Sequence, residues 1–494
     1  MTRVTTTPTS PPSTDRESSA SAAQASFTGR GRLILILLCA AQFSIAIDFS
    51  ILNVALPSLG ADLHLKESQL QWAITAFALP SGGFLLLAGR LGDLIGRRRM
   101  FLTGLTIFAV ASLAASLAIG PATFLAARAL QGLGAAITIP TAMALLTTNF
   151  AEGPARTRAL GVSGMLLSLG FTLGMLLGGT LTSTLGWRST MALNVVMAVP
   201  VLLAAPRLLI ESRPAQRPRL DIPGAVTVTG GLLALIYAVS TGAESAWLRP
   251  DVIASLLLAS GLLISFVVAE SRTAQPLVSL PILRRRTVAW GNLGGMTTFA
   301  MASALTFLLT LYLQQVAGLS PMVSGLVFGV TGLGAAVAGV IASRMINRYA
   351  ARNVLVTGLL LQGLATGTMI MIDHRTIGVL LVLVFCTLAF FGHMFSVVSY
   401  GVAATSGLPD QEQGLATGLI TTAQQVGLTL GTPILSAVYA GRAAGLHATG
   451  ASPSSAMLAG LRAGIGVDAA ILIAGAVLMA IFLQPRTRTG RRPQ

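Results

Sequence analysis

Two charged residues inside apolar stretches are the part of this sequence best placed to do chemistry. Asp48 lies in the run "AIDFSILNVALP", and Arg128 lies in "LAARALQGLGAAITIP", about one turn before Gln131. An ionised carboxylate at the centre of a membrane span costs at least about 2.5 kcal/mol, and an arginine stays charged at every accessible pH. Each residue therefore needs a polar partner or water, and each is a candidate partner for the other.

An aspartate at such a depth can also move a proton. Burial disfavours a charged carboxylate and a nearby cation favours it, so a cavity that is alternately wet and dry can load and unload Asp48. Two simpler interpretations stay open: Asp48 could be a structural carboxylate, and Arg128 could reach the nearby membrane surface. Asp93, Glu270 and Asp468 lie near the ends of apolar spans. Asp48 is therefore the one clearly buried acid.

The composition places these charges in a membrane protein. Of the 494 residues, 53% are hydrophobic and only 10% are charged, and the mean hydropathy is +0.78. Soluble domains carry about 25% charged residues. Apolar runs of roughly 20 residues, the length that a helix needs to cross a bilayer, follow one another along almost the whole chain. The expected fold class is an all-α integral membrane protein.

Apolar stretches bounded by charges or turns predict about fourteen spans in three groups. Six lie near 33–56, 70–88, 100–119, 123–148, 160–185 and 190–210, two near 224–241 and 252–269, and six near 288–313, 321–343, 353–372, 377–404, 414–440 and 463–483. The predicted organisation is a disordered cytoplasmic tail (1–30), an N-terminal six-helix bundle (31–212), two additional central transmembrane helices (213–272), a C-terminal six-helix bundle (273–484) and a cytoplasmic tail (485–494).

Charge patterning predicts the orientation and excludes several classes of protein. Arginines gather in the joints after even-numbered spans, which places both termini in the cytoplasm. The formal net charge of +16 therefore marks topology, and we expect no nucleic-acid partner. Lys66 is the only lysine, so a Walker A motif is absent. Four scattered histidines give no metal-ligand spacing, and no nucleophile stands beside a base, so we expect no metal, no cofactor and no catalytic residue.

Two further patterns point to a built architecture. The segment "RLGDLIGRRRMF" (90–101) aligns with "RMINRYAARNVL" (344–355), and each follows the second span of a six-span group. Parallel internal repeats of this kind are a known transporter plan. In 161–181, glycines recur every four residues and would let another helix approach closely, although ordinary small-residue packing explains them as well.

These motifs together resemble the major facilitator superfamily, specifically its fourteen-span drug:proton antiporters of the EmrB/QacA type. "GRLGDLIGRRR" (89–99) is similar to the loop motif between spans two and three, and "DFSILNVALP" (48–57) and "RALQGLGAA" (128–136) resemble the first-span and fourth-span motifs. Met175 stands where the fifth-span antiporter motif has a proline. The glycines of that motif fall on Gly161, Gly170, Gly174, Gly178 and Gly179.

The resemblance implies two six-helix bundles of the major facilitator fold plus two extra transmembrane helices. It implies a proton-coupled efflux transporter that exports hydrophobic drugs or antibiotics across the cell membrane by alternating access. The partners would be protons, a small hydrophobic substrate and membrane lipid, and the protein would act as a monomer without an ATPase subunit. With one clearly buried acid, one proton per cycle is the simplest stoichiometry.

The resemblance also assigns roles to residues. Asp48 and Arg128 would couple the proton, and Asp93 would accept hydrogen bonds from the end of a neighbouring helix in a conformational gate. His393 could equally be a packing residue. The full gate comprises Gly89, Asp93, Gly96, Arg97 and Arg98, and the polar candidates of the substrate cavity are Asn53, Gln131, Asn292 and His393.

Three other functions stay open on the sequence. The protein could be a dedicated exporter of one endogenous secondary metabolite, which the residues do not separate from a multidrug exporter. It could be a proton-coupled importer of a small nutrient, because Met175 departs from the antiporter motif. A non-transporting receptor is disfavoured because no soluble signalling domain is evident.

Overall fold

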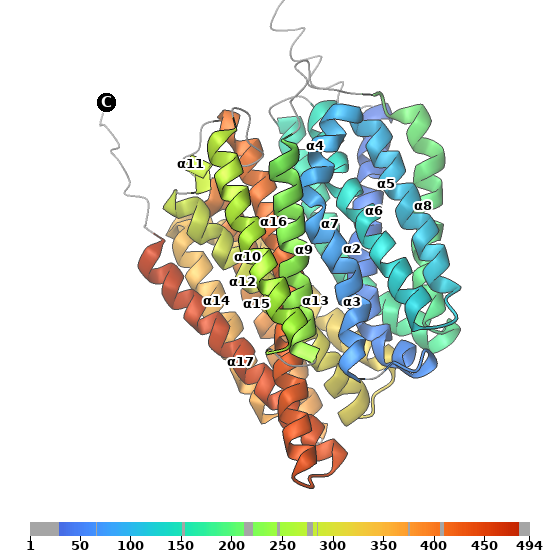
Figure 1. The fold of residues 1–494 in the computed structure, drawn as a ribbon, viewed down its shortest axis with the longest axis vertical. Coiled ribbons are helices and arrows are strands. Elements are labelled where there is room, and N and C mark those ends of the chain that lie inside the picture. The colour runs from blue at the N-terminus through green and yellow to red at the C-terminus, as the bar shows by residue number, and fades with distance from the viewer. Residues whose placement is uncertain are drawn as a thin grey trace, which may run out of the picture.

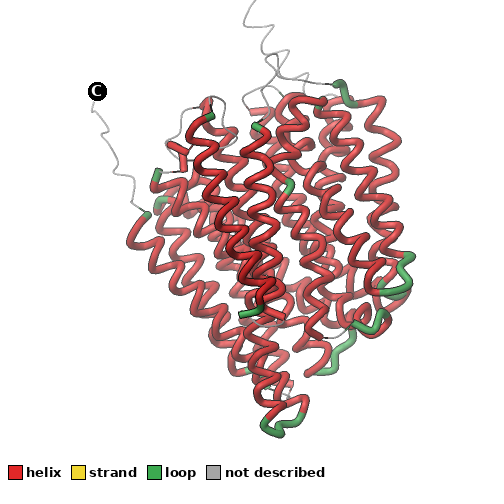
Figure 2. Tube along the Cα trace, in the orientation of Figure 1, coloured by secondary structure: helices red, strands yellow, loops and turns green. Residues whose placement is uncertain are grey.

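The structure is a bundle of long, roughly parallel and antiparallel helices (Figures 1 and 2). It is a computed structural model that describes residues 29–483, except 66, 151–153, 212–220, 245–247, 274–279, 284, 374–375 and 406–409. The predicted tails, 1–30 and 485–494, lie almost wholly outside the described residues. Helix is the regular structure found throughout the described part, as the composition predicts.

The helices fall into the predicted order. The first bundle contains α2 (Gly29–Asp62), α3 (Glu67–Gly83), α4 (Leu85–Ile95), α5 (Arg97–Ser116), α6 (Pro121–Asn149), α7 (Pro154–Leu185) and α8 (Arg188–Leu208). The central helices are α9 (Ile222–Glu244), α10 (Pro250–Arg272) and the short α11 (Leu280–Leu283). The second bundle contains α12 (Arg286–Leu311), the π-helical turn η1 (Tyr312–Val316), α13 (Pro321–Tyr349), α14 (Ala351–Thr368), the 3₁₀ turn η2 (Met369–Met371), α15 (Thr376–Thr405), α16 (Asp410–Ala448) and α17 (Pro453–Phe482).

Every predicted span coincides with a long helix, or with the pair α3 and α4 in the case of the second span. Among the described residues, eleven helices are long and apolar enough to cross a membrane, and α3 with α4, bent by 48°, adds a twelfth. The remaining two of the predicted spans, α7 and α16, are outside this set. The chain is a multi-pass membrane protein, and the number fourteen stays a prediction.

Missing side chains bring α7 close to α2, the helix that carries Asp48. A Cβ added at Gly174 would lie 1.9 Å from Ser50 Oγ, and one at Gly178 would lie 2.6 Å from the Ile51 carbonyl oxygen. Gly170 faces α2 in the same way, against Phe43 and Ala46. Contact of this kind requires glycine, since no larger residue leaves room for the opposing backbone. The surroundings of Gly161 lie outside the described residues.

The two bundles meet along α7 and α13 and along α3 and α16. Gly179 of α7 and Gly325 of α13 face each other, so that a Cβ on Gly179 would lie 2.4 Å from the Pro321 carbonyl oxygen. Nearby, the Gln314 side chain donates to the Val54 carbonyl at 2.8 Å. These contacts close the molecule at the end that holds the last turns of α2, α7 and α12.

The central helices cover one side of this junction. In Figure 1, α9 and α10 stand side by side in front of the bundles, and α9 packs on both α3 and α16. The Gln71 side chain donates to the Ser240 carbonyl at 3.3 Å, and Trp72 and Tyr237 contact each other with ring centroids 6.4 Å apart. The long apolar face of α10 is largely exposed, as expected for a helix that faces lipid.

Candidate functional site

Asp48 and Arg128 form a buried ion pair inside the first bundle. Arg128 Nη1 lies 2.7 Å from Asp48 Oδ2, and the two side chains are 1% and 0% exposed. The interior position agrees with the requirement that a charge at this depth be paired. Asp48 is therefore neither solvated nor at a helix tip, and Arg128 does not reach the membrane surface.

Neighbouring helices complete the hydrogen bonding of this pair. Asn194 of α8 donates to Asp48 Oδ1 at 2.5 Å, and Gln131 of α6 approaches the same oxygen at 3.5 Å. Gln131 also accepts from Arg128 Nη1 at 2.9 Å and donates to Ser112 Oγ at 2.7 Å. Both carboxylate oxygens thus have donors, which lowers the cost of burying the charge.

Phe77 separates this buried network from the central cavity. The Arg128 guanidinium lies over the Phe77 ring, with its carbon 4.6 Å from the ring centroid, and Arg128 Nε donates to the Ala73 carbonyl at 3.0 Å. Phe77 and Phe49 both line the cavity, with centroids 6.3 Å apart. Asp48 and Arg128 are not themselves lining residues. A molecule in the cavity would therefore touch the aromatic cover of the ion pair, not the ion pair.

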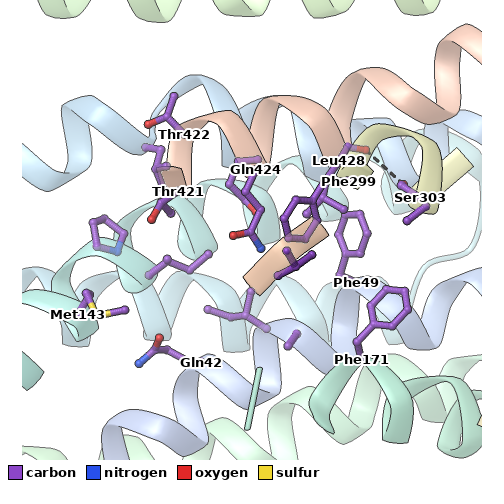
Figure 3. A pocket seen from close by; sticks show the side chains of 18 of the residues that line it. Gln42, Phe49, Met143, Phe171, Phe299, Ser303, Thr421, Thr422, Gln424 and Leu428 are labelled. Atoms are coloured by element: carbon purple, nitrogen blue, oxygen red, sulfur yellow. Dashed lines mark hydrogen bonds between the residues drawn. The ribbon is translucent and has the colours of Figure 1, made fainter. Parts of the chain in front are cut away.

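The cavity lies between the two bundles and has a volume of about 980 Å³. It is within the size range of drug-binding pockets. Figure 3 shows Phe49, Phe171 and Phe299 gathered towards one end, and Met143, Thr421 and Thr422 at the other. The cavity extends to the end of α4, where Arg90, Asp93 and Arg97 line it. It is thus apolar and aromatic inside and charged at its mouth.

The structure separates the four predicted cavity residues. His393 lines the cavity, whereas Asn53, Gln131 and Asn292 do not. Gln131 is turned into the ion-pair network. Asn53 and Asn292 each donate back to a carbonyl four residues earlier in their own helix, at 2.9 Å in both cases. The polar cavity residues that the sequence did not single out include Gln42, Ser303, Thr331, Gln424 and Gln425.

The predicted gate has a different hydrogen-bonding pattern from the expected one. Asp93 pairs with Arg97 one turn along the chain, with Nε at 3.0 Å and Nη2 at 2.9 Å from Oδ1. The carboxylate at the end of a neighbouring helix is instead Glu211, which accepts from the backbone N–H groups of Arg98 and Arg99 at 3.1 and 3.2 Å. An acid at a helix N-terminus satisfies free donors and the helix dipole. The role expected for Asp93 therefore belongs to Glu211.

The glycines of the gate have separate functions. Gly96 has φ of 124° and forms the break between α4 and α5, a conformation that L-residues rarely adopt. Gly89 lines the cavity on α4. Arg98 donates to the Pro206 carbonyl at the end of α8, at 2.6 Å. The basic segment therefore ties α4, α5 and α8 together at the mouth of the cavity.

A second buried acid lies in the other bundle. Asp468 of α17 is fully buried, and neither of its carboxyl oxygens has a hydrogen-bond partner among the described residues. The sequence placed it near a span end because the apolar run begins near 463. The helix begins earlier, at Pro453, so Asp468 lies about four turns inside it. Within the described residues, no three His, Cys, Asp or Glu side chains are grouped so as to hold a metal ion.

This architecture defines a class of protein. Two helical bundles that are joined at one end of a drug-sized cavity, with a buried ion pair beside that cavity, form the framework of a membrane transporter. Residues 38–432 match the family model of the Major Facilitator Superfamily. The chain belongs to this superfamily, whose members transport small molecules and are not enzymes.

Similar proteins include antibiotic exporters. The chain is 37% identical over 420 residues to the cephamycin export protein CmcT of Amycolatopsis lactamdurans, covering 83% of this chain and 85% of the relative. It is 35% identical over 461 residues to the puromycin resistance protein pur8 of Streptomyces alboniger, covering 92% and 91%. A crystal structure of a POT family transporter in complex with a thioalcohol-conjugated peptide has a TM-score of 0.70 at 12% identity, covering 92% of this chain and 97% of that one. The last similarity shows the fold alone.

Proposed function

We propose that this protein is a proton-coupled efflux transporter that exports hydrophobic drugs or antibiotics across the cell membrane by alternating access. The observation that carries the proposal is the large aromatic cavity beside a fully buried aspartate–arginine pair. The printed names of the relatives, cephamycin export and puromycin resistance, support export as the direction. Both termini would be cytoplasmic, so that the cavity mouth at Arg90, Asp93 and Arg97 faces the cytoplasm.

The proton would act on Asp48. Protonation removes the negative charge that holds Arg128, and Asn194 and Gln131 then lose their charged acceptor. Because the guanidinium rests on Phe77, a change in the ion pair moves a ring that lines the cavity. Substrate and proton would therefore compete through Phe77, without touching each other. This indirect route replaces direct displacement of the proton by the substrate at Asp48.

The available driving force suits a neutral substrate. A proton that moves inward down 100 mV yields about 2.3 kcal/mol, and one pH unit adds about 1.4 kcal/mol. One proton could then expel a neutral compound against a gradient of roughly 500-fold. A monocation exchanged one for one would lose the voltage contribution. No ATPase subunit is needed for this work, and a monomer contains the whole cavity.

The test is Asp48→Asn in reconstituted vesicles, with pH-driven efflux of a fluorescent drug as the readout. Asp62→Asn is the matched control, because Asp62 is also on α2 and also pairs with an arginine, Arg188, but is 45% exposed. We expect the Asp48 variant to lose pH-driven efflux and the Asp62 variant to retain it. Unchanged efflux with Asp48→Asn would show that the proton site is wrong.

Export of one endogenous metabolite is the second candidate, since an export protein for a single antibiotic, cephamycin, is a close relative by identity and coverage. A substrate panel separates the two functions: a multidrug exporter moves several unrelated apolar compounds in the same vesicles, whereas a dedicated exporter moves one. Flux of every compound in the inward direction under an inward proton gradient would instead support the importer.

A further inference from the structure

A chain of three hydrogen-bonded side chains supports His393 in the second bundle. Thr298 Oγ1 lies 2.6 Å from Gln362 Oε1 and 2.8 Å from His393 Nδ1. Thr298 is fully buried and Gln362 is 1% exposed, so water does not substitute for either partner. Gln362 is oriented by its amide nitrogen, which donates to the Thr298 carbonyl at 3.4 Å. The three residues come from α12, α14 and α15.

The proton count of this chain fixes the tautomer of the histidine. A threonine hydroxyl has one proton, and the amide oxygen of Gln362 has none to give. Thr298 must therefore donate to Gln362, and it can only accept from His393. The neutral imidazole then carries its proton on Nδ1, which leaves Nε2 with a lone pair and makes it a hydrogen-bond acceptor.

The surroundings of the ring direct that acceptor to the cavity. His393 lines the cavity, and Nε2 has no hydrogen-bond partner among the described residues. Phe299 and Phe390 pack edge to face against the imidazole, with centroids 5.2 and 5.7 Å away. Phe299 lies at the aromatic end of the cavity in Figure 3. Nε2 is thus an acceptor set in an aromatic wall, with Nδ1 already in use.

We propose that His393 is a specificity-determining residue whose Nε2 accepts a hydrogen bond from an N–H or O–H group of the exported compound. Thr298 and Gln362 are positioning residues that hold the tautomer and the ring. The favoured substrates are aromatic compounds with an amine, amide or hydroxyl donor, because a compound without a donor leaves the buried acceptor unpaired. This inference rests on the proposed export function, of which it names the substrate class.

A matched pair of dyes tests the inference. Rhodamine 110 and tetramethylrhodamine are zwitterions with the same aromatic frame, but methylation removes every N–H donor from the second. Binding of each dye to the full-length protein in lipid nanodiscs is measured by fluorescence polarisation. A net hydrogen bond is worth about five- to tenfold in affinity, so we expect the wild-type protein to favour rhodamine 110 by that factor.

The variants separate the hydrogen bond from the shape of the site. His393→Phe should reduce the ratio of the two affinities to near one, while His393→Gln, which keeps an acceptor oxygen, should restore part of it. Thr298→Val should also lower the ratio, since the ring loses the partner of Nδ1. Thr331→Val is the control, because Thr331 is a buried cavity-lining hydroxyl bonded to its own helix at 3.1 Å, and its ratio should match the wild type.

The outcomes distinguish the two levels of the proposal. If both dyes bind and the ratio is unchanged in His393→Phe and Thr298→Val, the role of His393 is wrong while the drug cavity stands. If neither dye binds the wild-type protein and neither is exported in vesicles, the proposed multidrug function is overturned together with the inference. A lowered ratio in both variants and an unchanged ratio in Thr331→Val support it.

Discussion

Gly96 and Ala350 occupy equivalent positions in the internal repeat, and both have a positive φ, 124° and 67°. Each is the residue between the second and third helices of its bundle. Two residues further on, Arg98 donates to the Pro206 carbonyl near the end of α8, and Arg352 donates to the Ala480 carbonyl near the end of α17. The repeat that the sequence suggested therefore extends to backbone conformation and hydrogen bonding.

Ala350→Gly should stabilise the protein, because Ala350 pays a steric cost at φ 67° that glycine avoids. The gain should be about 1 kcal/mol, seen as a rise of roughly 1–2 °C in the thermal unfolding midpoint of the purified protein. The reverse change at the equivalent position, Gly96→Ala, is the comparison. It should lower the midpoint, since the new methyl would lie 2.6 Å from Glu211 Oε1. A lower midpoint for Ala350→Gly would contradict the strain argument.

Arg128→Met should destabilise the protein by about 3–5 kcal/mol, because it leaves the Asp48 carboxylate buried without its cation. Adding Asp48→Leu should recover most of this loss, since both charges are then gone, yet pH-driven efflux should stay absent. Thermal unfolding and vesicle efflux, measured on the same preparations, separate the two effects. Efflux by the double variant at the wild-type rate would exclude the pair from proton coupling.

Most of the fold could be predicted from the sequence, because apolar length and arginine distribution are local signals. The spans, their grouping and the internal repeat are all of this kind. Span ends were less accurate: α17 begins at Pro453, about ten residues before its apolar run, because the first turns contain polar residues that remain helical. Burial of Asp468 was missed for this reason.

The site was predicted only in part, because partners across helices depend on packing. An acid and an arginine in apolar spans indicate a buried pair, and Asp48 and Arg128 do meet. No sequence signal tied Asn194 or Ser112 to that pair, although Asn194 lies in a family-like stretch. Phe77 was missed because a phenylalanine in an apolar span looks like ordinary core. Glu211 was missed although it is an acid within a run of arginines.

Asp468→Asn should be at least as stable as the wild-type protein and should transport at the same rate. A carboxylate with no hydrogen-bond partner contributes no pairing energy, whereas a neutral amide of the same size costs less to bury. Asp48→Asn is the comparison, and it should be less stable because Arg128 loses its charged partner. Loss of pH-driven efflux in Asp468→Asn would reveal a second proton site and overturn the stoichiometry of one proton.

Gly179→Ala should favour the conformation in which the closed end of the molecule is open. The added methyl would lie 2.4 Å from the Pro321 carbonyl oxygen and 3.1 Å from the Gly325 Cα, and backbone atoms cannot turn aside as a flexible side chain does. Relief requires α7 and α13 to separate where Gln314 also bonds to the Val54 carbonyl. An overlap of this size costs about 1–3 kcal/mol, which shifts a two-state equilibrium about 5- to 150-fold.

The shift can be measured with a cysteine at Val54, which is fully buried at the closed end. The native Cys39 and Cys386 are buried as well, so a membrane-impermeant maleimide added to whole cells should react mainly with Val54→Cys. We expect faster labelling when Gly179→Ala is added, by at least about fivefold if opening limits the reaction. Gly261→Ala on α10 is the control, because a Cβ there meets nothing within 4 Å, and it should leave the rate unchanged. Equal labelling rates in both variants would mean that the crossing of α7 and α13 does not hold the closed end shut.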